Sequence, residues 1–342
     1  MNRSLPARVL LATAFLLAAC AAFAIPTDIT YSEGEASIRF KTGKQQEAEI
    51  GAVVNTGDVL KTGRDGLVEL DQKGVVLKIS PNTVFTLMER EQKGSATPVL
   101  SIALGSIKFR YNKLTGKEPT VQTNGCALGV RGTEFSVFAG ADGSTLVVVD
   151  SGSVEVEAEG KAVSLAPEEG VEVKLGQGPG EKFAVHSDQV DYSKWNDEKL
   201  AGMLADPAAA MTGIEERMAS YIQSVTEYDG LYRASRQRLD EERKKKAAIL
   251  EQKGKEEAQK LEEEIISPLA FQTGYLFLNV RYFSLAALSL RRYVGGRMYM
   301  FMKSRYITTP ADPAWTEFRG RFDGLLESFE RSVVPQLTAE DI

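Results

Sequence analysis

Short runs of β-branched and apolar residues fill residues 29–186, and Gly, Asp, Asn or Pro breaks them at intervals of about ten residues, as in antiparallel sandwiches and barrels. Several runs alternate apolar with polar residues, which buries one face of a strand. The clearest runs lie at 67–70, 75–79, 135–138, 146–149 and 154–157. Glycines between runs, such as Gly74 and Gly152, supply the positive φ angles of hairpin turns. An all-β domain is therefore predicted for residues 28–187.

Beyond a linker predicted at 188–197, the composition shifts to helix formers, and an all-α domain is predicted for residues 198–342. Apolar and aromatic residues there are spaced alternately four and three apart, which is a heptad seam. The seam consists of Ile214, Met218, Tyr221, Val225, Tyr228, Tyr232, Ser235 and Leu239. The charged stretch that follows predicts an extended arm at about 214–266 that Pro268 ends. An antiparallel hairpin within the chain and an intermolecular coiled coil both fit this arm.

The segment 269–305 is rich in Leu, Phe, Tyr and Met, but arginines interrupt it too often for a membrane-spanning helix. Since no Asp or Glu occurs between Glu264 and Asp312, the segment is locally basic. Either it matches the acidic run that precedes it, or it lies on anionic lipid. Asp312 and Pro313 start a last helix with an aromatic stripe, and Pro335 ends it.

The first 24 residues have the features of a signal peptide: Arg3 and Arg8, an apolar core at 9–19, and an Ala-Phe-Ala cleavage site that ends at Ala24. A competing interpretation is a lipobox at 17–20, in which Cys20 is acylated and anchors the protein. We favour cleavage after Ala24, because the residues after Cys20 are apolar rather than a polar tether. The protein is expected to be exported, either free in the periplasm or held as a lipoprotein.

The residues that usually carry catalysis are scarce. The single histidine, His186, has no partner at metal-ligand spacing, and no nucleophile motif lies near it. Cys126 lies in an apolar stretch and is interpreted as a buried small hydrophobe. A net charge of -6 argues against a general nucleic-acid binder. We therefore expect no enzyme activity, no cofactor, no metal and no nucleic acid.

The β region carries an ordered series of motifs. The series begins with Gly-Asp-Val-Leu-Lys-Thr-Gly at 57–63 and Ser-Pro-Asn-Thr at 80–83, and its most specific piece is Val-Arg-Gly-Thr-Glu-Phe-Ser-Val at 130–137. This order of motifs resembles the FecR family. The resemblance covers about residues 51–175 and implies a periplasmic all-β module, either β-solenoid-like or a rolled sheet. In the named members this module senses the state of an outer-membrane transporter and follows a cytoplasmic anti-sigma segment and a membrane helix. Here the predicted signal peptide leads almost directly into the β region.

We interpret the matching motif residues as scaffold. Gly132 allows a close approach of two backbones or a positive φ, and Arg131 is expected to pair with a neighbouring carboxylate. The motif residues are Gly57, Asp58, Thr62, Gly63, Pro81, Thr83, Val130, Arg131, Gly132, Thr133 and Phe135.

The whole pattern predicts an α+β multidomain protein: an all-β FecR-like domain followed by a helical bundle with a long coiled-coil-like hairpin. The favoured hypothesis is a non-catalytic extracytoplasmic binding or signal-relay protein of the bacterial envelope, with another envelope protein as its partner. One alternative is an envelope scaffold that self-associates through the helix at 214–239. Another is an enzyme that acts on cell-wall glycan. Peripheral lipid contact is a further expectation for the basic segment.

Overall fold

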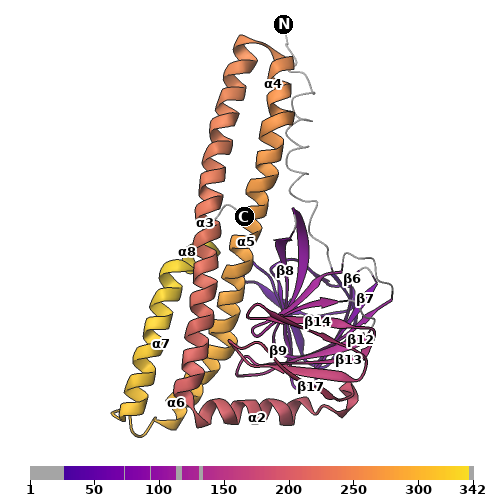
Figure 1. Ribbon diagram of the computed structural model, residues 1–342, viewed down its shortest axis with the longest axis vertical. Helices are drawn as coiled ribbons and strands as arrows, with labels where there is room; N and C mark the ends of the chain where they lie inside the picture. Colours follow the sequence, from indigo (N-terminus) through magenta and orange to yellow (C-terminus); the bar gives the residue numbers. More distant parts are fainter. Residues whose placement is uncertain (1–26, 73, 93, 113–117, 131–133, 339–342) are drawn as a thin grey trace.

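The computed structural model describes residues 27–72, 74–92, 94–112, 118–130 and 134–338. A strand-rich N-terminal part is followed by a long helical part, which confirms the predicted α+β order (Figure 1). The predicted signal peptide, with Ala24 and Cys20, lies outside the described residues, as do Arg131, Gly132 and Thr133.

The described residues of the β domain form seventeen strands. Their bounds are β1 Thr27–Glu33, β2 Ala36–Arg39, β3 Gln45–Glu47, β4 Val53–Val54, β5 Val59–Thr62, β6 Leu67–Gln72, β7 Val75–Ile79, β8 Val84–Gln92, β9 Ser95–Tyr111, β10 Thr120–Thr123, β11 Ala127–Val130, β12 Glu134–Ala139, β13 Thr145–Ser151, β14 Val154–Ala158, β15 Lys161–Leu165, β16 Glu169–Val173 and β17 Pro179–Ala184. The pairings form two layers, in the orders β4-β1-β6-β7-β9-β12-β13-β16-β17 and β3-β2-β5-β8-β9-β10-β11-β14-β15. Within these layers only β9 and β10 run parallel, so the rolled-sheet form describes the domain better than a solenoid of parallel coils.

Strand β9 belongs to both layers because it bends at Gly105. Before the bend β9 pairs with β8, and after it with β7 and β12. Gly105 has a φ of 103°, and a Cβ there would collide with Thr83. Only glycine fits this backbone. The two layers enclose one apolar core that includes Phe85, Phe109 and Phe135.

The helices are α2 Tyr192–Ala205, α3 Pro207–Gln252, α4 Lys255–Leu261, α5 Ser267–Ser289, α6 Gly296–Arg305, α7 Pro313–Ser332 and α8 Val334–Thr338. A short turn, η1 (Ser187–Gln189), precedes them, and two π-helical turns, η2 (Glu262–Ile266) and η3 (Leu290–Gly295), interrupt the return helix. Asp206 caps α3 and Asp312 caps α7, each by accepting a backbone N–H bond. Helix α2 begins inside the segment 188–197.

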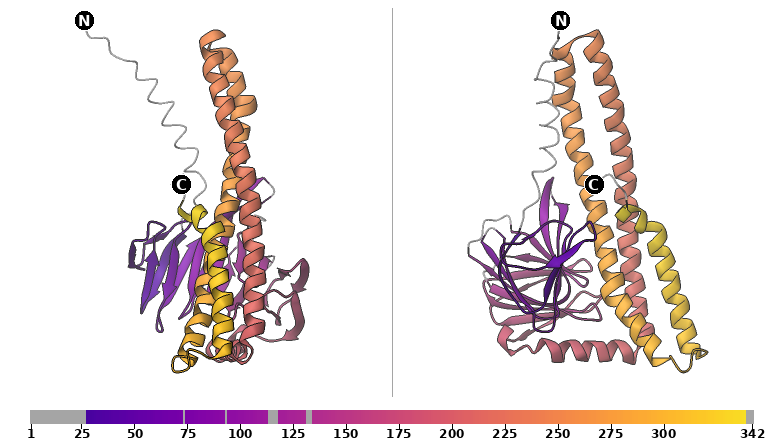
Figure 2. Two further views of the ribbon diagram at one scale, coloured as in Figure 1. Left: turned by 90° about the vertical axis from the view of Figure 1, so that its left-hand side faces the viewer. Right: turned by 180° about the vertical axis from the view of Figure 1, so that it is seen from behind.

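The two long helical runs form an antiparallel hairpin that extends past the β domain, and α7 packs beside the half of α3 nearer its N-terminus (Figures 1 and 2). The chain reverses at Gly254, whose φ is 87°. Pro268 was expected to end the arm, but it lies in the first turn of α5, directly after the π-helical turn η2. The helix continues past this residue, because a proline is tolerated in the first turn of a helix.

The heptad seam on α3 packs against α5 of the same chain. Tyr228 stacks on Phe283 with ring centroids 5.6 Å apart, and the hydroxyl groups of Ser235 and Thr273 lie 2.7 Å apart. Nearer the tip, the Lys246 Nζ lies 2.8 Å from a Glu262 carboxylate oxygen. Part of the acidic run is therefore met by α3 rather than by the basic segment that follows it. The described helices include none long and apolar enough to cross a bilayer.

Candidate functional site: the contact between the β domain and the helices

Helix α5 packs against β8, and this contact joins the two domains (Figure 2). The burial pattern of β8 reflects this contact. The first five residues of β8 are all buried, whereas β14 alternates buried with exposed residues in the way a one-sided strand does. Met88 and Val99 form a small apolar cluster with Tyr282 of α5. Two further apolar clusters join the strands to α2 and η3, and polar residues add specific hydrogen bonds and charges to these contacts.

Gly57 and Asp58 of the first family motif form the loop that α5 meets. The Asp58 carboxylate accepts hydrogen bonds from the backbone N–H groups of Lys41, at 3.1 Å, and Asn55, at 2.9 Å, and only 2% of the residue is exposed. Gly57 has a φ of 91°, and a Cβ there would lie 2.5 Å from a guanidinium nitrogen of Arg281. The motif therefore shapes a loop against which an arginine of the helical domain packs.

Glu89 on β8 is the second carboxyl group near Arg281. Burial raises the pKa of Glu89, while Thr56 and the positive charge of Arg281 act on that pKa in the opposite direction. Burial lowers the pKa of Arg281, and the charges of Glu89 and Asp58 oppose that shift. Removal of either Glu89 or Arg281 would leave the other group desolvated with less compensation.

Asn279, two residues before Arg281, meets the next carboxylate of β8. Its side-chain oxygen accepts the backbone N–H of Glu91 at 3.0 Å, and its amide nitrogen lies 3.4 Å from the Glu91 carboxylate. Asn279 is 2% exposed. Glu89 and Glu91 thus both face α5, and each meets a different polar residue of that helix.

Tyr192, the first residue of α2, ties the helical domain to the bend of β9. Its hydroxyl oxygen accepts the Gly105 N–H at 2.9 Å and donates to the Ala139 carbonyl at 3.0 Å. Its ring stacks on Phe138, with centroids 6.4 Å apart. Burial raises the pKa of Tyr192 to about 12, so the hydroxyl keeps its proton at neutral pH. Tyr192 therefore fixes α2 to two neighbouring strands, β9 and β12.

Arg217 makes the third connection, from α3. Its Nε donates to the Asn124 carbonyl at 3.1 Å, and a terminal nitrogen lies 3.0 Å from the Glu159 carboxylate. The guanidinium also lies 5.0 Å from the ring centroid of Tyr221. Residues of α2, α3 and α5 thus hold the β domain at separate points.

The other motif residues within the described ranges bond to one another inside the β domain. The Thr62 hydroxyl donates to the Ser80 carbonyl at 2.7 Å and accepts the Thr83 N–H at 2.9 Å. The Thr83 hydroxyl accepts the Ser106 N–H at 3.1 Å. The Gly63 carbonyl accepts the N–H of the residue after Pro81 at 2.9 Å. These bonds hold the turn before β8 against the bend of β9.

The last motif contributes to the apolar core. The Phe135 ring stacks on Phe109 with centroids 4.9 Å apart, and Phe135 is fully buried. Val130 pairs with Val154 across β11 and β14. The predicted pairing of Arg131 with a carboxylate falls outside the described residues and stays a prediction.

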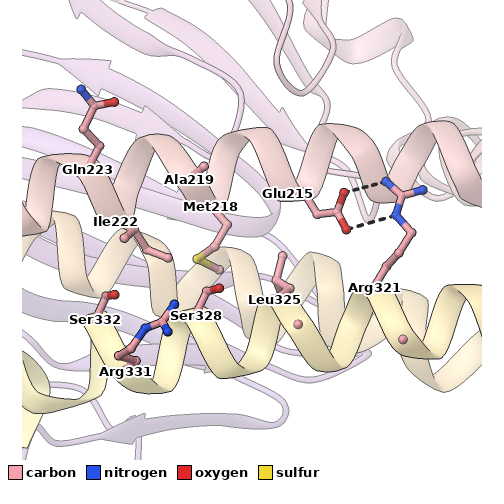
Figure 3. Close-up of a pocket in the computed structure, with 12 residues that line it drawn as sticks. Glu215, Met218, Ala219, Ile222, Gln223, Arg321, Leu325, Ser328, Arg331 and Ser332 are labelled. Atoms are coloured by element: carbon pink, nitrogen blue, oxygen red, sulfur yellow. Dashed lines mark hydrogen bonds and ion pairs between the residues drawn. The ribbon is translucent and has the colours of Figure 1, made fainter.

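A surface groove between α3 and α7 has a volume of about 580 Å³ (Figure 3). Met218, Ile222 and Leu325 give it an apolar floor, and Arg321 lies at one end in an ion pair with Glu215 at 2.6 Å. The carboxylate and the guanidinium neutralise each other. The residues that line the groove therefore present no arrangement of acid, base and nucleophile.

The side chains outside the groove that could react or bind a metal lie apart from one another. Burial raises the pKa of the Cys126 thiol to about 11, which keeps it protonated and unreactive at neutral pH. The His186 Nδ1 lies 3.8 Å from Asp150 and 3.7 Å from Asp188. Among the described residues, no group of His, Cys, Asp and Glu has the geometry of a metal site.

Sequence reasoning missed the residues that join the domains. In the sequence Arg281 stands out only as an interruption of an apolar segment, and nothing local marks Asn279 or Tyr192. The available signal is a pair of polar residues, two apart, inside an otherwise apolar helix. Such residues are costly to bury unless a specific partner awaits them.

Comparisons with known proteins agree with the resemblance seen in the motifs. Residues 58–155 match the FecR protein family. No curated protein matches the chain. Two crystal structures of a candidate anti-sigma factor from Parabacteroides distasonis ATCC 8503 align at 21% identity, with TM-scores of 0.34 and 0.33. The alignments cover 40% and 38% of this chain, and 63% and 61% of those chains, so this chain spans less than two thirds of their length.

Proposed function

We propose that this chain, which carries a FecR domain over residues 58–155, is a non-catalytic signal-relay protein of the bacterial envelope. In this proposal the β domain engages a partner protein, and the helical hairpin passes that engagement on. The observation that carries the proposal is the packing of Arg281 on α5 against Gly57 of the Gly57–Asp58 loop, with the charges of Asp58 and Glu89 close enough to act on that of Arg281. A family motif and the helical domain meet at this point.

The contact has properties that suit a relay. Arg281 and Glu89 are both partly buried, so separating them without exposing them to water is costly. Two states of the domain contact are therefore favoured: one in which the two groups stay together and one in which both are hydrated. Helix α5 is joined through η2 and α4 to the hairpin tip at Gly254. A partner that moves the Gly57–Asp58 loop would bias the position of the whole hairpin.

The location and the absence of catalysis are parts of the same proposal. The predicted signal peptide at 1–24 supports export, with cleavage after Ala24 preferred to acylation of Cys20. A binding role is supported by two observations: His186 lies near two carboxylates, and burial keeps the thiol of Cys126 protonated. The scaffold alternative has less support, since the seam it would use packs on α5 of the same chain.

The test uses the full chain in its own cell, with a photo-reactive amino acid at Leu250, which is 45% exposed near the hairpin tip. We expect the unaltered contact to give a cross-link to a specific envelope protein. The double variant Glu89→Gln, Arg281→Gln should lose or change that cross-link. Arg243→Gln on the exposed arm is the matched control and should leave it intact. A cross-link pattern that is identical in all three proteins would contradict the relay.

A further inference from the structure

A cluster of positive charge lies on the outer face of the second sheet layer. Arg39 on β2 pairs in register with Val59, and Ser37 pairs with Lys61 on β5. Because opposed residues share a face and side chains alternate, Arg39 and Lys61 both point outward. The core on the other face holds their fully buried neighbours, Ile38 and Leu60.

The π-helical turn η3 brings a further cation to this face. The Lys61 Nζ lies 5.5 Å from the ring centroid of Tyr293, and that ring packs with Val59 against an apolar cluster on the sheet. Arg292, the neighbour of Tyr293, is exposed. A π-helical turn alters the register of the residues that it carries, and such turns are frequent at functional sites.

The cations of this cluster act on one another. Burial of part of the side chain lowers the pKa of Arg292, and the positive charges of Arg39 and Arg291 lower it further. The Arg291 guanidinium itself lies 5.2 Å from the ring centroid of Phe329, on α7. We name Arg39, Lys61 and Arg292 the basic crease; Lys61 lies against the ring of Tyr293, the neighbour of Arg292 in the chain.

Carboxylates do not neutralise the basic crease. Within the described part of the chain, none of its three cations forms an ion pair, whereas Arg217 pairs with Glu159 and Arg321 with Glu215. An acidic residue that shares the face is Glu47, which stands opposite Ser37 on β3 and is exposed. In a protein of net charge -6, an uncompensated basic cluster marks a surface that attracts anions.

We propose that the basic crease docks an acidic segment of a protein partner, an inference that rests on the relay function and deepens it by giving the chemistry of one partner. Arg39 and Lys61 are half-buried, and Lys61 lies against the ring of Tyr293, which η3 carries. Carboxylate side chains on a narrow chain segment can reach half-buried cations, while a flat bilayer meets protruding cations best. The cations come from three elements, β2, β5 and η3, which suits successive carboxylates, and the partly buried ring of Tyr293 lies beside Lys61.

The test measures the fluorescence anisotropy of a fluorescein-labelled, glutamate-rich peptide with a central tyrosine, in the presence of the purified full chain. We expect saturable binding that weakens as salt is added, and no binding of the same peptide with glutamine in place of glutamate. Arg39→Glu and Arg292→Glu should each weaken binding about tenfold, the effect of opposing like charges at an interface. Arg64→Glu, on an exposed turn, changes the net charge equally and should leave binding unchanged.

Several outcomes would overturn the proposal. The first is that the peptide does not bind. The second is that Arg64→Glu weakens peptide binding as much as Arg39→Glu and Arg292→Glu do. The third is that the protein sediments with phosphatidylglycerol vesicles in a way that requires Arg39 and Arg292, while the peptide does not bind. Circular dichroism of each variant shows whether it has kept its fold. The relay itself is judged by the cross-link at Leu250, so the failure of one proposal is distinguishable from the failure of the other.

Discussion

Replacing Arg281 with Met removes the positive charge beside Glu89 and keeps most of the apolar volume of the side chain. Loss of one partner of a directly paired buried ion costs about 3–5 kcal/mol, which is an upper bound for the charge interaction between Arg281 and Glu89. Glu89 is only partly buried, so we discount this to about 1–3 kcal/mol of unfolding free energy at pH 7. Urea unfolding followed by tryptophan fluorescence measures the loss, because Trp195 packs on the β domain and Trp315 in the helical core.

The dependence on pH separates this electrostatic cost from a packing defect. Burial raises the pKa of Glu89, so the folded protein binds its proton more tightly than the unfolded chain does. Stability from this carboxyl group is therefore greatest at low pH and falls as the pH rises through the folded pKa. Without Arg281 that pKa rises further, and the difference between Arg281→Met and the original protein should shrink from pH 7 to pH 5. Arg281→Lys keeps the positive charge and should lower the free energy of unfolding less than Arg281→Met does. A loss that is the same at both pH values would refute the reasoning.

Three further changes have definite expected results. Tyr192→Phe leaves the Gly105 N–H and the Ala139 carbonyl without their partner and should cost about 1–3 kcal/mol in urea unfolding, while Tyr228→Phe, whose ring stacks on Phe283, should cost less. Gly105→Ala puts a Cβ into Thr83 at a φ of 103° and should lower the melting temperature sharply in calorimetry, unlike Gly129→Ala, whose nearest neighbour lies at 3.8 Å. Cys20→Ala should leave export and cell fractionation unchanged if cleavage follows Ala24, whereas loss of membrane association would establish acylation.

The strands were predictable because their signals are local. The alternation at 154–157 reappears as β14, with alternating burial, and Gly74 has the positive φ that its turn requires. The start of α7 was equally predictable from the sequence, since Asp312 caps the helix and Pro313 occupies its first turn. In each case a few neighbouring residues determine the geometry.

The domain contact was not predictable in the same way because its determinants are far apart in sequence. The burial of both faces of β8 depends on helical residues far along the chain: Tyr282 of α5 packs on Met88, and Tyr293 of η3 packs on the cluster that contains Val84. The course of the chain at Pro268 was not predictable for a related reason: the helix continues from the π turn η2 into α5, and both pack on α3. Local propensity carries no information about either.

Because β9 is the strand that both layers share, the order of synthesis matters for this domain. Strands β7 and β8 each take β9 as a partner, so neither has its second neighbour until residue 95 and beyond have been made. A nascent chain that stops short of Ser95 presents two unpaired strand edges, which are templates for association with other chains. Protection by a chaperone during this interval would matter more for this protein than for one whose sheets close hairpin by hairpin.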